Sequence, residues 1–258
     1  MRLANKVALV TGAGGGLGSA IARRLAGEGA SVLCTDMDLD RANAVVTQIT
    51  EAGGTASSLH ADVGDPQHCE AQVDETVKRY GRIDILINNA GIAHHSLALD
   101  TALDDWERIL RINLTGSFLT AQAAARRMVG QGSGRIVQLG SISGQRGNMG
   151  GIAYGASKAA VMHVCKVLAV ELSGDGVMVN TIAPGPIETG ISKHGPSRRK
   201  SYLDRIPAGS YGNAEAVAEA ALYLSSDACQ WTTGAVINVD GGFAAAGLSY
   251  DRDEVGRA

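Results

Sequence analysis

Two kinds of hydrophobic pattern alternate along this chain. Short, nearly continuous apolar runs rich in β-branched residues recur, and each is typical of a buried strand. Longer segments, in which apolar residues return at helical spacing, separate them. The short runs are KVALVTG (6–12), ASVLCTD (30–36), ASSLHADV (56–63), IDILINNAG (83–91), RIVQLGS (135–141), VMVNTIAPG (177–185) and AVINVDGG (235–242). The pattern therefore predicts seven strands.

The segments between these runs predict helices, among them 17–29, 40–54, 66–81 and 213–227. Continuous apolar strands that alternate with helices indicate a parallel sheet buried on both faces. With right-handed crossovers, the units form a doubly wound, seven-stranded α/β fold of Rossmann type, with helices on both faces. Because no linker or shift of composition divides the sequence, we expect a single domain over 1–258.

The segment from about 188 to 212 has no strand pattern and is rich in glycine, serine, proline and basic residues. A long excursion of this kind after a strand is a candidate substrate lid. An ordinary surface loop explains the same composition equally well.

Composition excludes several functional classes. A net charge of −3 argues against a general binder of nucleic acids or membrane surfaces. The four cysteines are scattered without a C-x-x-C pair, so we expect neither a metal site nor a disulfide framework. The first apolar run holds only four residues, too few for the core of a signal peptide or for a membrane span, and this favours a cytoplasmic protein.

A glycine-rich turn, TGAGGGLG at 11–18, follows the first predicted strand and opens the first predicted helix. A helix N-terminus offers unpaired N–H groups to a phosphate, and glycines allow the backbone to approach it. The spacing is T-G-x-x-x-G-x-G, with Gly12, Gly16 and Gly18. Asp36 ends the second strand, where an acid binds the adenosine ribose and repels a 2′-phosphate, which favours NAD over NADP. A turn residue is the other explanation of Asp36.

The order of six motifs resembles the classical short-chain dehydrogenase/reductase family. The motifs are TGAGGGLG (11–18), NNAG (88–91), NLTG (113–116), GSIS (140–143), YGASK (154–158) and PGPIET (184–189). Each motif is short, but six in this order are specific, and the resemblance covers nearly the whole chain. It implies an oxidoreductase that transfers a hydride between a nicotinamide cofactor and a secondary alcohol or ketone.

Tyr154 and Lys158 are four residues apart, so on a helix they share one face. A free tyrosine, with a pKa near 10, is a poor base at neutral pH. A lysine ammonium about 4 Å from the phenolate is worth about 4 kcal/mol at an effective dielectric near 20, or roughly three pKa units. The pair is therefore predicted to bring the tyrosine toward the pH range where acid–base catalysis is efficient.

The family resemblance implies two further catalytic residues. Ser141, thirteen residues before Tyr154, would orient the substrate oxygen, with Ser143 as the second candidate. Asn113 matches the family position that anchors a water beside Lys158 and begins a proton relay. A mid-helix asparagine bonded to its local backbone is the alternative for Asn113.

The remaining family positions imply cofactor contacts in four parts of the chain. These contacts would be Gly12, Gly15, Gly16, Leu17, Gly18, Asp36, Met37, Asp62, Val63, Asn89, Ala90, Gly91, Tyr154, Lys158, Pro184, Gly185, Ile187 and Thr189. Asp62 and Val63 would flank the adenine, and the last four would hold the nicotinamide carboxamide.

The substrate side is less defined. Its candidates are His94, His95, Ser96, Gln145, Met149 and the segment 190–212; the basic run at 197–200 would attract an anionic substrate unless it is a solvated face. An enzyme that prefers NAD tends to oxidise alcohols, because NAD⁺ exceeds NADH in a cell. We therefore expect the substrate to be a small secondary alcohol, polyol or sugar.

Two other functions stay open. One is an acyl-carrier-protein ketoreductase, which usually has basic residues before its fifth and sixth strands, where this chain has GQGSGR (130–135) and SGDG (173–176). The other is an NAD-binding sensor or scaffold without turnover. The resemblance also implies a homotetramer formed through helices near 104–128 and 153–173, although the apolar second helix would fit a monomer core nearly as well.

Overall fold

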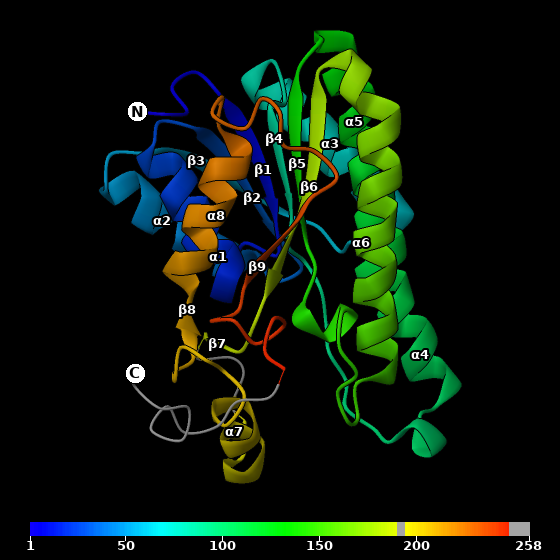
Figure 1. Ribbon diagram of the computed structural model, residues 1–258. Helices are drawn as coiled ribbons and strands as arrows, with labels where there is room; N and C mark the ends of the chain where they lie inside the picture. Colours follow the sequence, from blue (N-terminus) through cyan, green and yellow to red (C-terminus); the bar gives the residue numbers. More distant parts are fainter. Residues whose placement is uncertain (190–193, 248–258) are drawn as a thin grey trace.

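Seven parallel strands form the central sheet in the order β3-β2-β1-β4-β5-β6-β9 (Figure 1). This computed structural model describes residues 1–189 and 194–247. The strands are β1 (Val7–Thr11), β2 (Ser31–Asp36), β3 (Thr55–His60), β4 (Ile85–Asn88), β5 (Gly134–Leu139), β6 (Val177–Pro184) and β9 (Val236–Val239). All seven predicted strands are confirmed, and each lies within a residue or a few of its expected limits.

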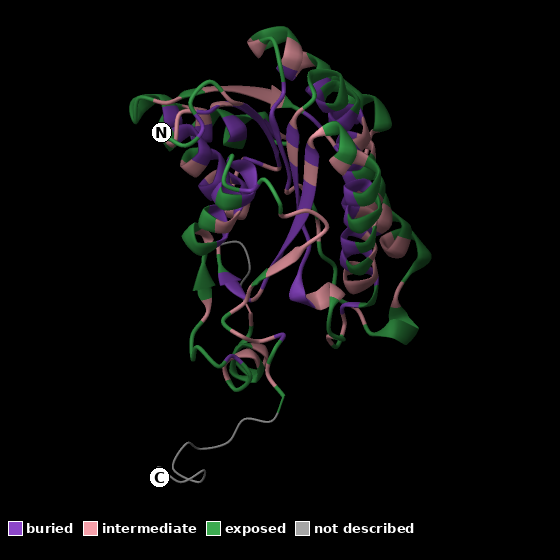
Figure 2. Ribbon diagram, turned by 45° about the horizontal axis from the view of Figure 1, so that its top comes forward, coloured by how far each residue is buried: buried purple, intermediate pink, exposed green. Residues whose placement is uncertain are grey.

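Helices cover both faces of the sheet (Figures 1 and 2). One layer contains α1 (Gly16–Gly27), α2 (Leu39–Glu51) and α8 (Ala214–Ser225). The other contains α3 (Pro66–Tyr80), α5 (Ser117–Gln131) and α6 (Ile152–Leu172). Short 3-10 turns are η1 (Ala98–Asp100), η3 (Ile142–Gly144) and η4 (Ser173–Asp175). The expected doubly wound α/β fold is therefore confirmed.

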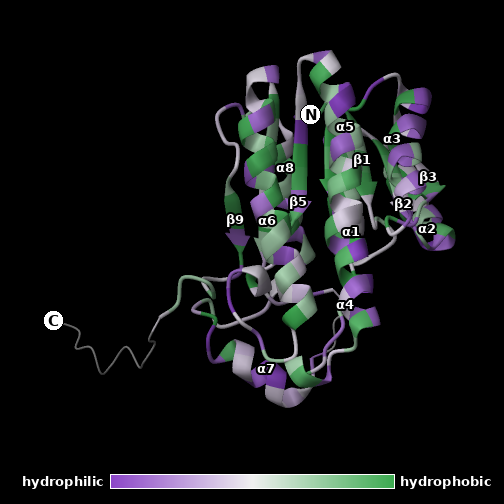
Figure 3. Ribbon diagram, turned by 90° about the vertical axis from the view of Figure 1, so that its right-hand side faces the viewer, coloured by the Kyte–Doolittle hydropathy of each residue, from purple (hydrophilic) through white to green (hydrophobic). Residues whose placement is uncertain are grey.

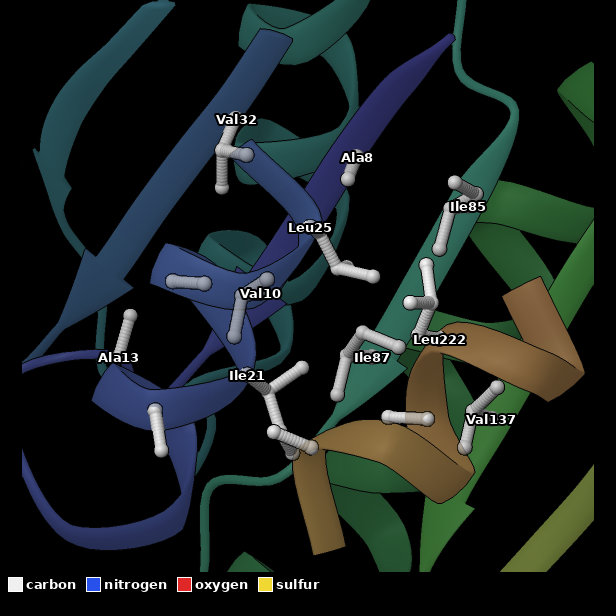
Figure 4. Close-up of a cluster of buried hydrophobic side chains, with 14 of the residues drawn as sticks. Ala8, Val10, Ala13, Ile21, Leu25, Val32, Ile85, Ile87, Val137 and Leu222 are labelled. Carbon is white, nitrogen blue, oxygen red and sulfur yellow. The ribbon is translucent and has the colours of Figure 1, made fainter. Parts of the chain in front are cut away.

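The two layers explain why the strands are apolar on both sides. Along β1, Ala8 and Val10 pack into the cluster beneath α1 and α8, whereas Leu9 packs into the cluster on the opposite face. Figure 4 shows Val10 near Ile21 of α1, with Leu222 of α8 in the same cluster. Successive strand residues point to opposite faces, so a sheet covered twice needs hydrophobic residues at every position.

Asp84, the residue before β4, has a structural role. Its buried carboxylate accepts a hydrogen bond from the Val7 backbone N–H at 2.9 Å and pairs with Arg82 at 2.6 Å. The side chain therefore ties the start of β1 to the start of β4.

The helical region expected near 104–128 is not one regular helix. It consists of α4 (Leu103–Leu110), a π-helical segment η2 (Arg111–Gly116) and α5. A methyl group at Gly116 would lie only 2.1 Å from the carbonyl oxygen of Val63, so the backbone approaches the loop after β3 there. π-Helical turns inside α-helices occur frequently at functional sites, and this one contains Asn113.

The segment predicted as a lid is tied together at its ends. β7 (Ile187–Glu188) pairs in parallel with β8 (Gly212–Asn213), so the segment's first and last residues do join a short sheet, contrary to expectation. Between them, α7 (Pro196–Leu203) lies beyond the carboxyl ends of the strands, and Figure 3 shows its polar character. Residues 190–193 lie outside the described part of the chain. Among the described residues, no helix has the length and apolar character that crossing a membrane requires.

Candidate active site

The glycine turn and the NNAG motif meet where the strand order reverses between β1 and β4. Asn89 donates from its side-chain amide to the carbonyl oxygens of Thr11 at 3.0 Å and Gly12 at 2.9 Å. The Thr11 hydroxyl accepts from the backbone N–H groups of Asn89 and Ala90, both at 3.0 Å. Ligands of open α/β sheets bind in the crevice at this switch point.

The backbone of the turn requires its glycines. Gly12 and Gly16 have φ angles of 62° and 55°, a left-handed region that other residues rarely adopt. A methyl group at Gly18 would lie 2.1 Å from the Gly12 carbonyl oxygen. Gly15, the N-cap of α1, has no side chain, so the first N–H groups of this helix are available to an anion. Leu17 is partly buried and packs against the core.

Asp36 is oriented by two backbone contacts. Its carboxylate accepts from the N–H of Gly14 at 2.8 Å and from the N–H of Asp38 at 3.0 Å. Each oxygen retains a lone pair for a further donor, such as a ribose hydroxyl. Met37, beside it, is 68% exposed. The turn and this carboxylate together fit the diphosphate and ribose of a dinucleotide.

The other predicted cofactor contacts lie at the same edge of the sheet. Asp62 uses its carboxylate to accept from the Gly64 N–H at 2.8 Å, and Val63 is buried. After β6, a methyl group at Gly185 would lie 2.7 Å from the Cα of Asp240, so only glycine fits there.

Pro184 and Ile187 are buried, and Thr189 is partly buried at the end of the described segment. These positions are compatible with the roles predicted for them, which stay predictions.

Tyr154 and Lys158 lie in the first two turns of α6 and face the end of β5. Ser141, which follows β5, lies close enough to the Tyr154 hydroxyl to lower the pKa of that residue. Lys158 is buried, and its Nζ donates to the carbonyl oxygen of Leu139 at 2.7 Å, 5.8 Å from the centre of the Tyr154 ring. Burial lowers the pKa of Lys158 to about 8.

The pKa of Tyr154 departs from the sequence-based expectation. Burial raises it above the ordinary tyrosine value, and the hydrogen bond with Ser141 only partly opposes this. The expectation of a lowered pKa is wrong here, because it considered only the charge of Lys158 and left out the desolvation of the phenol, which is the largest effect. The structure buries Lys158 and directs its amine to the carbonyl of Leu139.

Asn113 reaches across to the loop after β4. Its Oδ1 accepts from the Ile92 N–H at 2.8 Å, and its Nδ2 donates to the Ile92 carbonyl at 2.9 Å and to the Ser157 hydroxyl at 3.1 Å. The alternative of a locally bonded asparagine is wrong, because Ile92 is 21 residues away. A methyl group at Gly91 would lie 3.1 Å from Asn113 Oδ1 and 3.5 Å from Lys158 Nζ, so these groups converge on one point.

The second serine candidate is occupied elsewhere. The Ser143 hydroxyl accepts from the side-chain amide of Asn148 at 2.7 Å, and its backbone N–H donates to Ser141 Oγ at 3.1 Å. Ser141 is therefore the serine whose hydroxyl meets Tyr154.

Two cavities, of about 610 and 1230 Å³, adjoin this group of residues and share the segment 146–149 as a wall. The smaller one touches Ser143 and Gly155, neighbours of Ser141 and Tyr154, whereas none of the four candidate catalytic residues lines either cavity directly. The smaller cavity is also lined by Ser96, and Met149 lines both.

Other predicted substrate-side residues have different partners. Gln145 lines the smaller cavity, but its side chain pairs with Asn238 at 2.8 Å. His94 lies 3.4 Å from Asp105.

Sequence reasoning missed Arg146, Phe243 and Ala246, all of which line the larger cavity. Arg146 directly follows the predicted Gln145, so its place in the loop was an available signal. Phe243 and Ala246 follow the last strand, and no local pattern marks them.

Comparisons with known proteins show which family, relatives and solved structures this chain is similar to. A family profile described as "Enoyl-(Acyl carrier protein) reductase" matches residues 12–244. A 3-oxoacyl-[acyl-carrier-protein] reductase of Thermotoga maritima is 39% identical over 94% of this chain and 99% of its own. A D-threitol dehydrogenase of Mycolicibacterium smegmatis is 40% identical over 94% of each. A crystal structure of a short-chain type dehydrogenase/reductase from Mycobacterium marinum superposes with a TM-score of 0.90 at 38% identity, over 94% of this chain and 96% of that one.

Proposed function

This chain belongs to the classical short-chain dehydrogenase/reductase family of oxidoreductases, which act on CH–OH groups, and within it we propose an NAD-dependent enzyme. Its substrate would be a small secondary alcohol, polyol or sugar, oxidised to the ketone. The observation that carries the proposal is the gathering of Ser141 and the buried Lys158 around Tyr154 at the end of β5, where Lys158 binds the carbonyl of Leu139.

The proposed chemistry uses Tyr154 as the proton carrier. Its raised pKa keeps the phenol neutral at neutral pH, which is the form that donates a proton to a ketone oxygen. Oxidation needs the phenolate, which accepts the hydroxyl proton of the alcohol. The Ser141 hydroxyl would hold the substrate oxygen beside the phenol. The nicotinamide ring, when bound, supplies or accepts the hydride, and its oxidised form adds a positive charge that favours the phenolate.

Lys158 and Asn113 would return the proton to solvent. With a pKa of about 8, the Lys158 amine can both hold and release a proton near neutral pH. The carboxamide of Asn113 is already bound to Ile92 and Ser157, so a relay through this residue would use its main-chain carbonyl. The proton would then pass from Tyr154 through Lys158 to a water molecule held by that carbonyl, and from there to solvent.

The preference for NAD rests on Asp36. Its carboxylate is held in place by Gly14 and Asp38 at the end of β2, where it would accept from ribose hydroxyls and repel a 2′-phosphate. Repulsion between like charges at close range costs several kcal/mol, which is enough for a strong preference for NAD over NADP.

A 3-oxoacyl-thioester reductase is the second candidate, favoured by the 39% identical relative with that name. Two features count against it. The segments 130–135 and 173–176 are rich in glycine where such reductases usually have basic residues, and the carboxylate of Asp36 disfavours NADP. A cofactor sensor without turnover is the third, and the complete Ser141–Tyr154–Lys158 arrangement counts against that.

The proposal extends to one catalytic domain over 1–258, with the segment 188–212 as a substrate lid, and to a cytoplasmic homotetramer. Exposed apolar side chains on α6, among them Val167 (44% exposed) and Val170 (82% exposed), support association of copies through this helix.

The proposed function is tested by offering the protein secondary alcohols, polyols, sugars and 3-hydroxyacyl thioesters with NAD⁺ and NADP⁺ in parallel. We expect turnover with NAD⁺ that Tyr154→Phe abolishes while NADH binding persists. The matched control is Tyr223→Phe, which removes an exposed tyrosine hydroxyl that hydrogen-bonds to Thr232. We expect this variant to keep full activity. Turnover that survives Tyr154→Phe would refute the proposed mechanism.

A further inference from the structure

Three arginines from two distant parts of the chain converge on the larger cavity. Arg146 comes from the loop after η3, Arg198 from α7 and Arg205 from the turn that follows α7. Tyr202 and Phe243 add aromatic wall, with their ring centres 5.6 Å apart. The cavity, about 1230 Å³, has room for a small polar metabolite.

The other charges on and beside α7 are matched to one another. Arg199 pairs with Glu188 at 2.7 Å, and Lys200 pairs with Asp204 at 2.6 Å. Asp204, the one carboxylate in the cavity wall among the described residues, is therefore already neutralised by Lys200.

The three cavity arginines instead contact neutral acceptors. Within the described ranges, Arg146 donates to the carbonyl of Ala244 and Arg205 donates to the backbone and hydroxyl oxygens of Ser201. Arg198 donates to a histidine ring. The wall of the cavity thus carries a positive charge that the described part of the chain does not offset.

Arg198 is held in place by His95. Its guanidinium lies 3.0 Å from His95 Nε2, and His95 Nδ1 lies 3.3 Å from the carbonyl of Gly150. The two contacts together require the neutral tautomer with the proton on Nδ1. Burial and the neighbouring Arg198 lower the pKa of His95, which keeps this neutral form at physiological pH. Arg198 also lies 5.8 Å from the centre of the Tyr202 ring, so its position is constrained on two sides.

The larger cavity lies beside the smaller one, which touches neighbours of the candidate catalytic residues. The two cavities share the segment 146–149 as a wall, and the smaller one is also lined by Ser143 and Gly155. Tyr202, in the wall of the larger cavity, is near enough to Tyr154 to raise the pKa of that residue. A ligand anchored in the larger cavity would therefore reach past this segment toward the hydroxyls of Ser141 and Tyr154.

We propose that the substrate carries an anionic oxygen group, a carboxylate or a phosphate ester, bound by Arg198 with Arg146 and Arg205 while its hydroxyl meets Tyr154. Guanidinium groups match such groups with two parallel hydrogen bonds and hold their charge at any physiological pH. This inference rests on the proposed function and narrows its substrate class to hydroxy acids, sugar acids or sugar phosphates.

The test compares matched substrates that differ only in the anionic group: glucitol with gluconate and glucitol 6-phosphate, and threitol with threonate and threitol 4-phosphate. With NAD⁺, we expect kcat/KM for an anionic member to exceed that of its neutral partner by about tenfold or more. Arg198→Gln is expected to raise KM for the anion by about 10- to 100-fold, leaving kcat and the neutral substrate little changed. The carboxylate and phosphate arms show which group is bound.

Arg199→Gln is the matched control, because it removes a positive charge from the same helix, and neither Arg199 nor its partner Glu188 lines the cavity. Equal or better use of the neutral polyol, or an equal effect of Arg198→Gln and Arg199→Gln, would overturn the proposal. Should no alcohol be oxidised, the same compounds are titrated into the protein with NADH by calorimetry. Binding of the anion alone that Arg198→Gln weakens supports the inference, and no preference for the anion overturns it, independently of whether Tyr154 is catalytic.

Discussion

The Nζ of Lys158 donates to the main-chain carbonyl of Leu139 at 2.7 Å, and so links α6 to the last residue of β5. The amine is buried, and this carbonyl is its direct partner among the described residues. A neutral acceptor only partly compensates an ammonium group for lost hydration, which explains why burial lowers the pKa of Lys158 to about 8.

This lowered pKa predicts a stability difference that depends on pH. Between pH 8 and 10.5, Lys158 is neutral in the folded protein and protonated in the unfolded chain, so the unfolded state binds more protons. Stability therefore rises with pH in this window, by up to about 1.4 kcal/mol per pH unit from this group. Urea unfolding of the wild type and of Lys158→Met at several pH values across this window measures the effect. The free energy of unfolding of the wild type should increase with pH relative to that of the variant.

Lys166→Met is the control for that series, because Lys166 is exposed on the same helix. Its stability should follow the wild type at every pH. Parallel curves for the wild type and Lys158→Met would contradict a lowered pKa.

Ser141→Ala is expected to reduce kcat by about 100-fold or more, because it removes the hydroxyl that would hold the reacting oxygen. The hydrogen bond with Ser141 lowers the pKa of Tyr154, so its loss should move the rise of the oxidation rate to higher pH. A pH profile of alcohol oxidation measures both effects. Ser143→Ala, whose hydroxyl faces Asn148, should leave the profile in place, and an equal shift in both variants would contradict the assignment of Ser141.

Asp36→Asn keeps the size of the side chain and an acceptor for the Gly14 N–H while it removes the negative charge. We expect the ratio of kcat/KM for NAD⁺ over NADP⁺ to fall by about 10-fold or more, because repulsion of a 2′-phosphate disappears. Steady-state kinetics with both cofactors measure the ratio. Asp40→Asn, on the exposed first turn of α2, should leave it unchanged. An unaltered ratio in Asp36→Asn would place the ribose elsewhere.

Gly18→Ala should abolish tight NADH binding and destabilise the fold by several kcal/mol, because the new methyl group would overlap the carbonyl oxygen of Gly12. Fluorescence titration with NADH and thermal unfolding measure the two effects. Gly27→Ala, at the exposed end of the same helix with open space around it, should bind NADH normally and be unaltered or slightly more stable. Normal NADH binding by Gly18→Ala would contradict the close approach of the turn.

The fold could be predicted from the sequence because strands, helices and turns are indicated by residues that lie close together in the chain. Continuous apolar runs such as 83–91 can only be buried on both faces, so they predicted the parallel sheet and its two helical layers. The glycine turn at 11–18 was recognisable from its place between a strand and a helix, and Tyr154 and Lys158 share a helix face by spacing alone. These features depend on neighbours a few residues away.

The tertiary structure decided what depends on distant neighbours. It gave Asn113 its partner Ile92 through a π-helical turn, directed Lys158 to Leu139, and raised rather than lowered the pKa of Tyr154. It also brought Arg146 and Arg198 to one cavity from segments some fifty residues apart in the sequence. Burial and long-range contact set the energy of a charge, and neither can be read from residue spacing, because both arise only when the strands and helices pack together.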